Sequence, residues 1–141
     1  MIDKQAYYRG AAIFQLLHDD RTETVRPARP GFLINDEVFA LIKYTARVAT
    51  PWQFTFSPAE RDAVDKHRDD HEVVLALVCG GDGICAVRWD DVEEILDNPP
   101  TWITASRKFN KRYAISGSAG EMDGRVPRNQ WPGVVFDEEE D

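Results

Sequence analysis

The stretch VFALIKYTAR, residues 38–47, decides the fold class that this sequence predicts. Its first five residues are all apolar, which is typical of a central strand covered on both faces. Its second half alternates in character, and the polar face carries Lys43, Thr45 and Arg47. The stretch therefore predicts a long strand that starts inside the core and leaves it at Lys43, so that this charge reaches water.

Two longer helices are predicted on either side of this strand. Apolar residues at helical spacing predict the first over residues 5–18. The second begins at SPAE, residues 57–60, where Ser57 is the N-cap and Glu60 completes a capping box. This helix is expected to run to about His71 and, because it has few apolar residues, to cover a surface rather than fill a core.

The remaining elements follow from apolar runs and turn residues. Strands are expected, in addition to the one above, at residues 31–35, 52–56, 73–79, 84–89, 102–106 and 113–116. The polar, proline-containing residues 21–31 predict a loop. A short helix over residues 90–96, capped by Asp90 or Asp91, and an edge strand at residues 134–136 are also expected.

The order of these elements predicts a single α/β domain. Helix, three strands, helix and strand form an αβββαβ core, in which helices flank a mixed sheet, and a C-terminal β-hairpin follows. Neither an internal repeat nor a linker divides the chain. We therefore expect one domain over residues 1–136 and an acidic tail over residues 137–141.

Composition limits the classes of function. The chain has 141 residues, 43% of them hydrophobic, and a net charge of -8, of which the acidic tail supplies five charges. This acidity argues against strong sequence-independent DNA binding, although a local basic patch remains compatible with it. Because no apolar run approaches the roughly 20 residues of a membrane span and the N-terminus has no secretory pattern, a cytoplasmic location without a membrane partner is expected.

The cysteines and histidines give no metal site by their spacing. Cys79 and Cys85 flank a glycine-rich turn and are expected to be reduced, small apolar residues of two strands. The three histidines lie at no recognisable zinc spacing to them. No metal ligand and no cofactor is therefore assigned.

The αβββαβ order, with Pro30-Gly31 before the first strand and Leu41-Ile42-Lys43 in the second, resembles the restriction-endonuclease-like PD-(D/E)xK superfamily, in particular the Holliday-junction-resolvase type. The resemblance implies a nuclease fold in which two carboxylates hold Mg²⁺ beside a lysine that orients the attacking water. Lys43 stands at the lysine position. Gly31 and Leu41 stand where the family has its carboxylates, so the resemblance implies a degenerate metal site.

Asp36 and Glu37 leave one enzymatic alternative open. Both lie in the turn before the long strand and would supply a relocated carboxylate. In that case the protein is a Mg²⁺-dependent nuclease with Asp36 and Lys43 as catalytic residues. The degenerate alternative, in which the chain is not an enzyme, is preferred.

Two basic features are candidate binding surfaces. The first is the strand face of Lys43, Thr45 and Arg47, beside which Trp52 would lie exposed at a cleft; in the resembled family this strand end lines the nucleic-acid cleft. The second is the predicted hairpin loop 107–112, where basic and aromatic residues alternate as in sites that contact phosphates and stack on bases. Its four basic residues are Arg107, Lys108, Lys111 and Arg112. Solvated charge is the simpler interpretation of both features.

Three functions follow as hypotheses. The first is a catalytically degenerate nuclease-fold module that binds nucleic acid or an acidic partner through the strand face and the hairpin loop. The second is the Mg²⁺-dependent nuclease. The third is a structural subunit of a larger assembly, for example a defence system, that meets a protein partner through its acidic surface; a homodimer is also compatible with the sequence.

Overall fold

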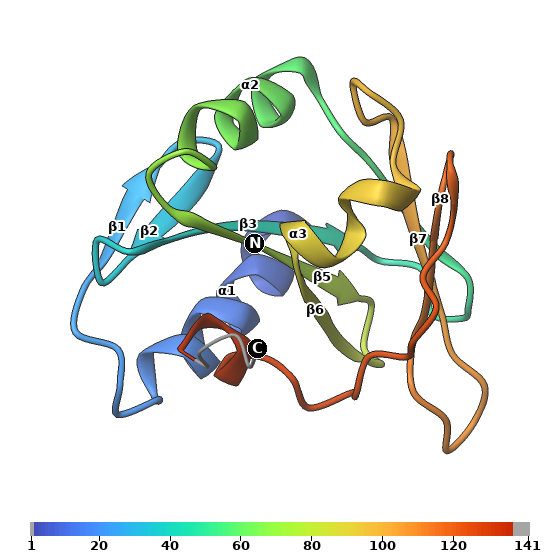
Figure 1. Ribbon diagram of the computed structural model, residues 1–141. Helices are drawn as coiled ribbons and strands as arrows, with labels where there is room; N and C mark the ends of the chain where they lie inside the picture. Colours follow the sequence, from blue (N-terminus) through green and yellow to red (C-terminus); the bar gives the residue numbers. More distant parts are fainter. Residues whose placement is uncertain (1, 137–141) are drawn as a thin grey trace.

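The computed structural model describes residues 2–136, so the predicted acidic tail lies outside the described residues (Figure 1). The elements are, in chain order, α1 (Lys4–Leu17), β1 (Val25–Ala28), β2 (Gly31–Ile34), β3 (Val38–Thr45), β4 (Trp52–Thr55), α2 (Pro58–His67), β5 (Glu72–Cys79), β6 (Gly83–Arg88), α3 (Trp89–Val92), the 3-10 turn η1 (Glu93–Ile95), β7 (Trp102–Ser106), β8 (Ala114–Gly117), β9 (Gly120–Glu121) and the 3-10 turn η2 (Gly133–Val135). None of the described helices is long and apolar enough to cross a bilayer.

A mixed five-stranded sheet forms the centre of the molecule, which confirms the predicted α/β class. Its strand order is β1-β2-β3-β5-β6. β3 and β5 pair in parallel, with Lys43 opposite Leu77, and every other pair in the sheet is antiparallel. The two apolar stretches that predicted central strands occupy the buried middle of this sheet, as expected for strands covered on both faces.

A second, antiparallel sheet has the order β4-β7-β8-β9. The strand predicted after β3 is therefore present as β4, but it pairs with the C-terminal hairpin, with Trp52 opposite Ala105. Its residues alternate between buried and exposed, which suits an antiparallel sheet with one face on the core. Through this second sheet the predicted hairpin, β7 and β8, packs against the central sheet.

Two apolar layers enclose the central sheet. Figure 1 shows α1 and the C-terminal turn on one side of it, and α2, α3 and the second sheet on the other. On the α1 side the core includes Ala12, Leu16 and Ile42. On the other side β3, β5 and β6 pack against the second sheet and α2, and Leu41 and Ile42, which precede Lys43 along β3, are fully buried.

Three local predictions are wrong. The expected loop 21–31 contains β1, which pairs with β2; its Pro27 is tolerated because β1 is an edge strand. The expected edge strand at residues 134–136 is instead the turn η2. The third helix begins at Trp89, so Asp90 and Asp91 lie in its first turn and neither is its N-cap.

The start of α2 matches its prediction. The Ser57 hydroxyl accepts from the Glu60 backbone N–H, and the Glu60 carboxylate accepts from the Ser57 N–H, which completes the capping box. The helix ends at His67, four residues earlier than expected. Its buried side chains are Glu60, Ala63 and Val64, so the carboxylate of the cap points into the molecule.

Candidate nucleic-acid interface

Lys43 forms a buried ion pair with Glu60. Only 9% of Lys43 is exposed, and its Nζ donates to Glu60 Oε2 at 2.7 Å and to Oε1 at 2.8 Å. The Phe56 ring lies 5.5 Å from the same Nζ, measured to the ring centroid. The prediction that β3 leaves the core at Lys43 is therefore wrong, because α2 covers this part of the strand and supplies the counter-charge.

Glu60 both caps α2 and forms the ion pair with Lys43. Burial disfavours its charge, but hydrogen bonds from Lys43 and from the Ser57 N–H outweigh this and hold the pKa of Glu60 below its ordinary value. The carboxylate thus stays ionised at neutral pH, caps α2 and neutralises Lys43. With both charges engaged in each other and little exposed to solvent, the pair has no free group to offer a ligand.

The remaining residues of the predicted strand face do not form one surface. Arg47 is exposed, and its Nε donates to the Ala49 carbonyl at 2.9 Å. Thr45 is half-buried, and its hydroxyl accepts from the Arg47 backbone N–H at 3.3 Å. Trp52 is 3% exposed and donates Nε1–H to the Arg47 carbonyl at 2.9 Å, so the prediction that it faces a cleft is wrong.

Asp36, the proposed relocated carboxylate, lies far from Lys43. It occupies the turn before β3, with a φ of 56°, and forms an ion pair with Arg26. The extended strand from Val38 to Lys43 alone spans about 17 Å, and Asp36 lies before it in the turn. Among residues 2–136, no three His, Cys, Asp or Glu side chains form a group that could hold a metal ion.

The two thiols are also unsuited to chemistry. Cys79 and Cys85 are free and buried. Burial raises the pKa of Cys79 to about 12 and that of Cys85 well above its usual range. Neither thiol is therefore a nucleophile at neutral pH.

An arginine clamp holds the β7–β8 hairpin against the central sheet. Arg107 donates Nε–H and Nη2–H to the Asp82 carboxylate, at 2.9 and 2.5 Å, in a bidentate pair. Its Nη1 donates to the carbonyls of Lys108 and Lys111, within the loop that follows β7. Arg107 was predicted to bind a ligand, but its guanidinium is committed to fixing the loop.

Asp82 is the centre of this clamp. It lies in the turn between β5 and β6 and also accepts from the Tyr113 hydroxyl at 2.7 Å, while Arg128 donates to its carbonyl. The hydrogen bond from Arg107 outweighs the effect of burial and lowers the pKa of Asp82. Burial and the bond to Asp82 raise the pKa of Tyr113 above its usual range. The loop therefore has a fixed base.

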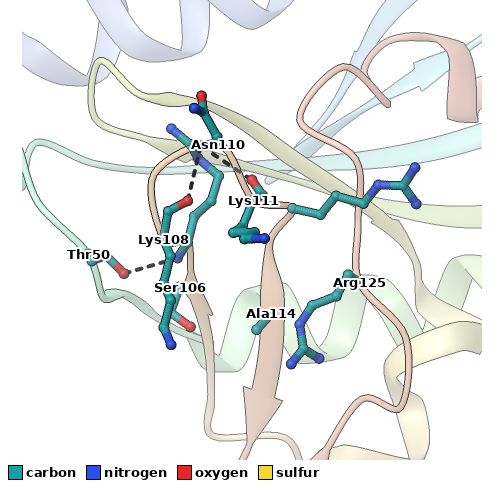
Figure 2. A pocket seen from close by; sticks show the side chains of 9 residues that line it. Thr50, Ser106, Lys108, Asn110, Lys111, Ala114 and Arg125 are labelled. Carbon is teal, nitrogen blue, oxygen red and sulfur yellow. Dashed lines mark hydrogen bonds between the residues drawn. The ribbon is translucent and has the colours of Figure 1, made fainter.

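A hollow of about 750 Å³ opens beside this loop (Figure 2). We call it the cationic cleft. It is lined by Thr50, Ser106, Arg107, Lys108, Asn110, Lys111, Arg112, Ala114 and Arg125. Figure 2 shows the side chains of Lys108 and Arg125 extending in the same direction on either side of Ala114. Five of the nine lining residues are cations and none is acidic, so the cleft is suited to an anion.

Four of these cations are available to a ligand. Lys108, Lys111, Arg112 and Arg125 are exposed, and no ion pair within residues 2–136 involves them. Phe109, between Lys108 and Asn110 in the same loop, is 86% exposed. The arrangement can therefore contact several phosphates and offer an aromatic face to a base.

Part of this site could be read from the sequence, and part could not. Lys108, Lys111 and Arg112 were predicted from the density of charge in one loop. The acceptor of Arg107, Asp82, lies 25 residues away along the chain, and local sequence contains no sign of that pairing. Arg125 enters the cleft because the chain after β9 returns beside the hairpin, through a bridge between Tyr113 and Val126.

Comparison with protein-family models, curated proteins and solved structures gave no match for this chain. The resemblance to the endonuclease-like superfamily therefore stays a prediction, which rests on element order and on Lys43.

Proposed function

We propose that this chain is a non-catalytic binding module that holds single-stranded nucleic acid in the cationic cleft of its β7–β8 hairpin. The observation that carries the proposal is the presence of four exposed cations around one hollow without a carboxylate in its lining, with the exposed ring of Phe109 in the same loop. The predicted strand face takes no part in it, because Lys43 is neutralised by Glu60.

Phosphate contacts supply the affinity in this proposal. Lys108, Lys111 and Arg112 stand on a loop whose base is fixed by Arg107 and Asp82, so little ordering of this loop is needed on binding. Arg125 adds a fourth cation from the segment after β9. The net charge of -8 weakens long-range attraction of any nucleic acid. Binding is therefore expected to be local, moderate and strongly dependent on salt concentration.

Phe109 favours a single strand over an acidic protein as the ligand. An exposed phenyl ring beside cations can stack on an unpaired base, and such stacking contributes about 1–3 kcal/mol per base. An acidic peptide offers carboxylates to the cations but gives the ring nothing to stack on. In a duplex the base faces are covered by their neighbours, so the ring would again lack a partner.

The test is a salt titration of binding to a labelled single-stranded oligonucleotide. We expect the Lys108→Ala/Lys111→Ala double variant to bind more weakly and to reduce the slope of log K against log salt by about 1.4, since each contact to a single strand contributes about 0.7. The matched control is Lys4→Ala/Lys66→Ala, which removes the same charge from exposed positions on α1 and α2. It should leave the slope unchanged.

The same experiment separates the other hypotheses. No binding by the intact chain at low salt would defeat the proposal and favour a protein partner. An equal loss in both double variants would mean that overall charge, and not the cleft, attracts the oligonucleotide. Cleavage of the oligonucleotide in the presence of Mg²⁺ would defeat the proposal that the module is non-catalytic.

A further inference from the structure

The end of α2 brings two imidazoles together, away from the cationic cleft. His67 is the last residue of α2, and the backbone N–H of His71 donates to the His67 carbonyl at 2.7 Å. This continues the helical spacing, which places the two side chains on one side of the turn. Their Nδ1 atoms lie 3.2 Å apart.

A rigid platform holds one of the two rings. The His67 imidazole stacks on the Phe39 ring, with the centroids 4.2 Å apart and the planes 9° from parallel. Phe39 is fully buried in the central strand β3, so it cannot move without disturbing the core. The His67 imidazole is therefore held in one position before any ligand binds. Such preorganisation favours chelation of a metal ion by His67 together with its neighbour His71.

The distance between the two nitrogens suits a shared metal ion. Zn²⁺ binds imidazole nitrogen at about 2.0–2.1 Å, and tetrahedral geometry then separates two ligand nitrogens by about 3.3 Å. The 3.2 Å between the Nδ1 atoms of His67 and His71 falls at this value. A proton shared between the rings accounts for the same distance, and a metal titration distinguishes the two.

The surrounding charge favours a cation. The eight residues from Asp65 to Glu72 include four carboxylates against two basic residues, and one of those bases, Arg68, is paired with Glu93. No third ligand from residues 2–136 joins the two imidazoles. The other coordination positions would be open to water.

We infer that His67 and His71 form a two-histidine site for Zn²⁺, which ties the end of α2 to the chain that enters β5. Imidazole ligands also suit Cu²⁺ and Ni²⁺, and the usual order of stability places Cu²⁺ above both Ni²⁺ and Zn²⁺. The site is independent of the nucleic-acid proposal, because it shares no residue with the cationic cleft.

The test is a titration of the full chain with Zn²⁺ alone, in competition with a colorimetric chelator, followed by thermal unfolding with and without Zn²⁺. We expect one Zn²⁺ to bind per chain and to raise the unfolding temperature, because the ion binds the folded state preferentially. His71→Ala should weaken binding by about a hundredfold, since chelation is lost with either ring. It should also abolish the thermal shift.

His18→Ala is the matched control. His18 is the remaining histidine of the chain, follows α1, and shares no contact with the pair. This variant should bind Zn²⁺ like the unaltered chain, with the same thermal shift. His67→Ala loses its stacking on Phe39 as well, so His71→Ala decides the question. Three results would each overturn the inference. They are unchanged Zn²⁺ affinity in His71→Ala, equal losses of affinity in His71→Ala and His18→Ala, and no Zn²⁺ binding by the unaltered chain.

Discussion

The two basic regions of this protein look alike in sequence and differ in structure. Lys43 lies on a central strand between two packed layers, and the carboxylate of Glu60 neutralises it there. The cations of the β7–β8 hairpin lie at the end of the second sheet, where the described residues place no layer over them. The comparison teaches that a charge marks a binding surface only where the topology leaves it both uncovered and unpaired.

Arg107 shows that the distinction operates within a single loop. It belongs to the basic run at residues 107–112, yet its guanidinium is bound by Asp82 and by two loop carbonyls. Lys108, the next residue, is exposed and takes part in no ion pair within residues 2–136. One cation of the loop therefore holds the loop in place, while the next is exposed to solvent.

The largest effect is expected when the buried ion pair between Lys43 and Glu60 is broken. Lys43→Met leaves the Glu60 carboxylate buried without its counter-charge, and removal of one partner of a buried pair costs about 3–5 kcal/mol. We expect a fall of about 3 kcal/mol in the free energy of unfolding, measured by urea denaturation. Affinity for the oligonucleotide should be unchanged at temperatures where the variant is folded.

Lys66→Met provides the control for that prediction. Lys66 is exposed on the same helix that carries Glu60, so the substitution should change stability by no more than about 0.5 kcal/mol. If Lys43→Met were as stable as this control, the ion pair would contribute little to the fold. If it folded normally but lost oligonucleotide binding, Lys43 would belong to the interface after all.

Sequence reasoning succeeded where the signal was local. The apolar run at the start of β3, the capping box of α2 and the basic hairpin loop are all encoded within a few residues, and the structure has each of them. It failed where partners are distant. Glu60 is 17 residues from Lys43. The capping box already accounts for that glutamate, so no sequence pattern predicted its ion pair with Lys43.

The same limit explains the misplaced strand. β4 was predicted correctly as a strand, but its partner β7 lies about 50 residues further along, beyond the reach of periodicity or turn signals. Once β4 joins the second sheet, Trp52 becomes a core residue instead of a cleft residue. The candidate surface then shrinks from two basic features to one.

A smaller effect is expected when the exposed ring of Phe109 is removed from the hairpin loop. Phe109→Ala removes a ring that is 86% exposed, so the fold should be unaffected. If the ring stacks on a base, affinity for the single-stranded oligonucleotide should fall by about 1 kcal/mol, or roughly fivefold, in a fluorescence anisotropy titration. The salt dependence should stay as it is, because no phosphate contact is lost.

Two further substitutions at Phe109 separate stacking from general apolar contact. Phe109→Tyr keeps the aromatic face and should keep the affinity, whereas Phe109→Leu should behave like Phe109→Ala. Equal affinity in all of these variants would remove the ring from the interface and leave a purely ionic cleft. That result would favour an acidic protein as the ligand over a nucleic acid.

The smallest effect comes from acid, and it acts on the two regions differently. The pKa of Glu60 in the folded state lies below its unfolded value of 4.5, so the ion pair stabilises the fold fully above pH 4.5 and loses this contribution as the pH falls through the lower, folded value. Glu60→Gln lacks the titration, so its deficit in unfolding free energy should be greatest near pH 7 and shrink below pH 4.5. The effect is smaller than that of Lys43→Met because a protonated Glu60 still fills its place and its carbonyl oxygen can still accept from both Lys43 and Ser57. The lysines and arginines of the cleft keep their charge throughout this range. Urea denaturation of both proteins from pH 7 to pH 3 measures the difference, and a deficit that stays constant with pH would show that Glu60 acts as a cap alone and not through its charge.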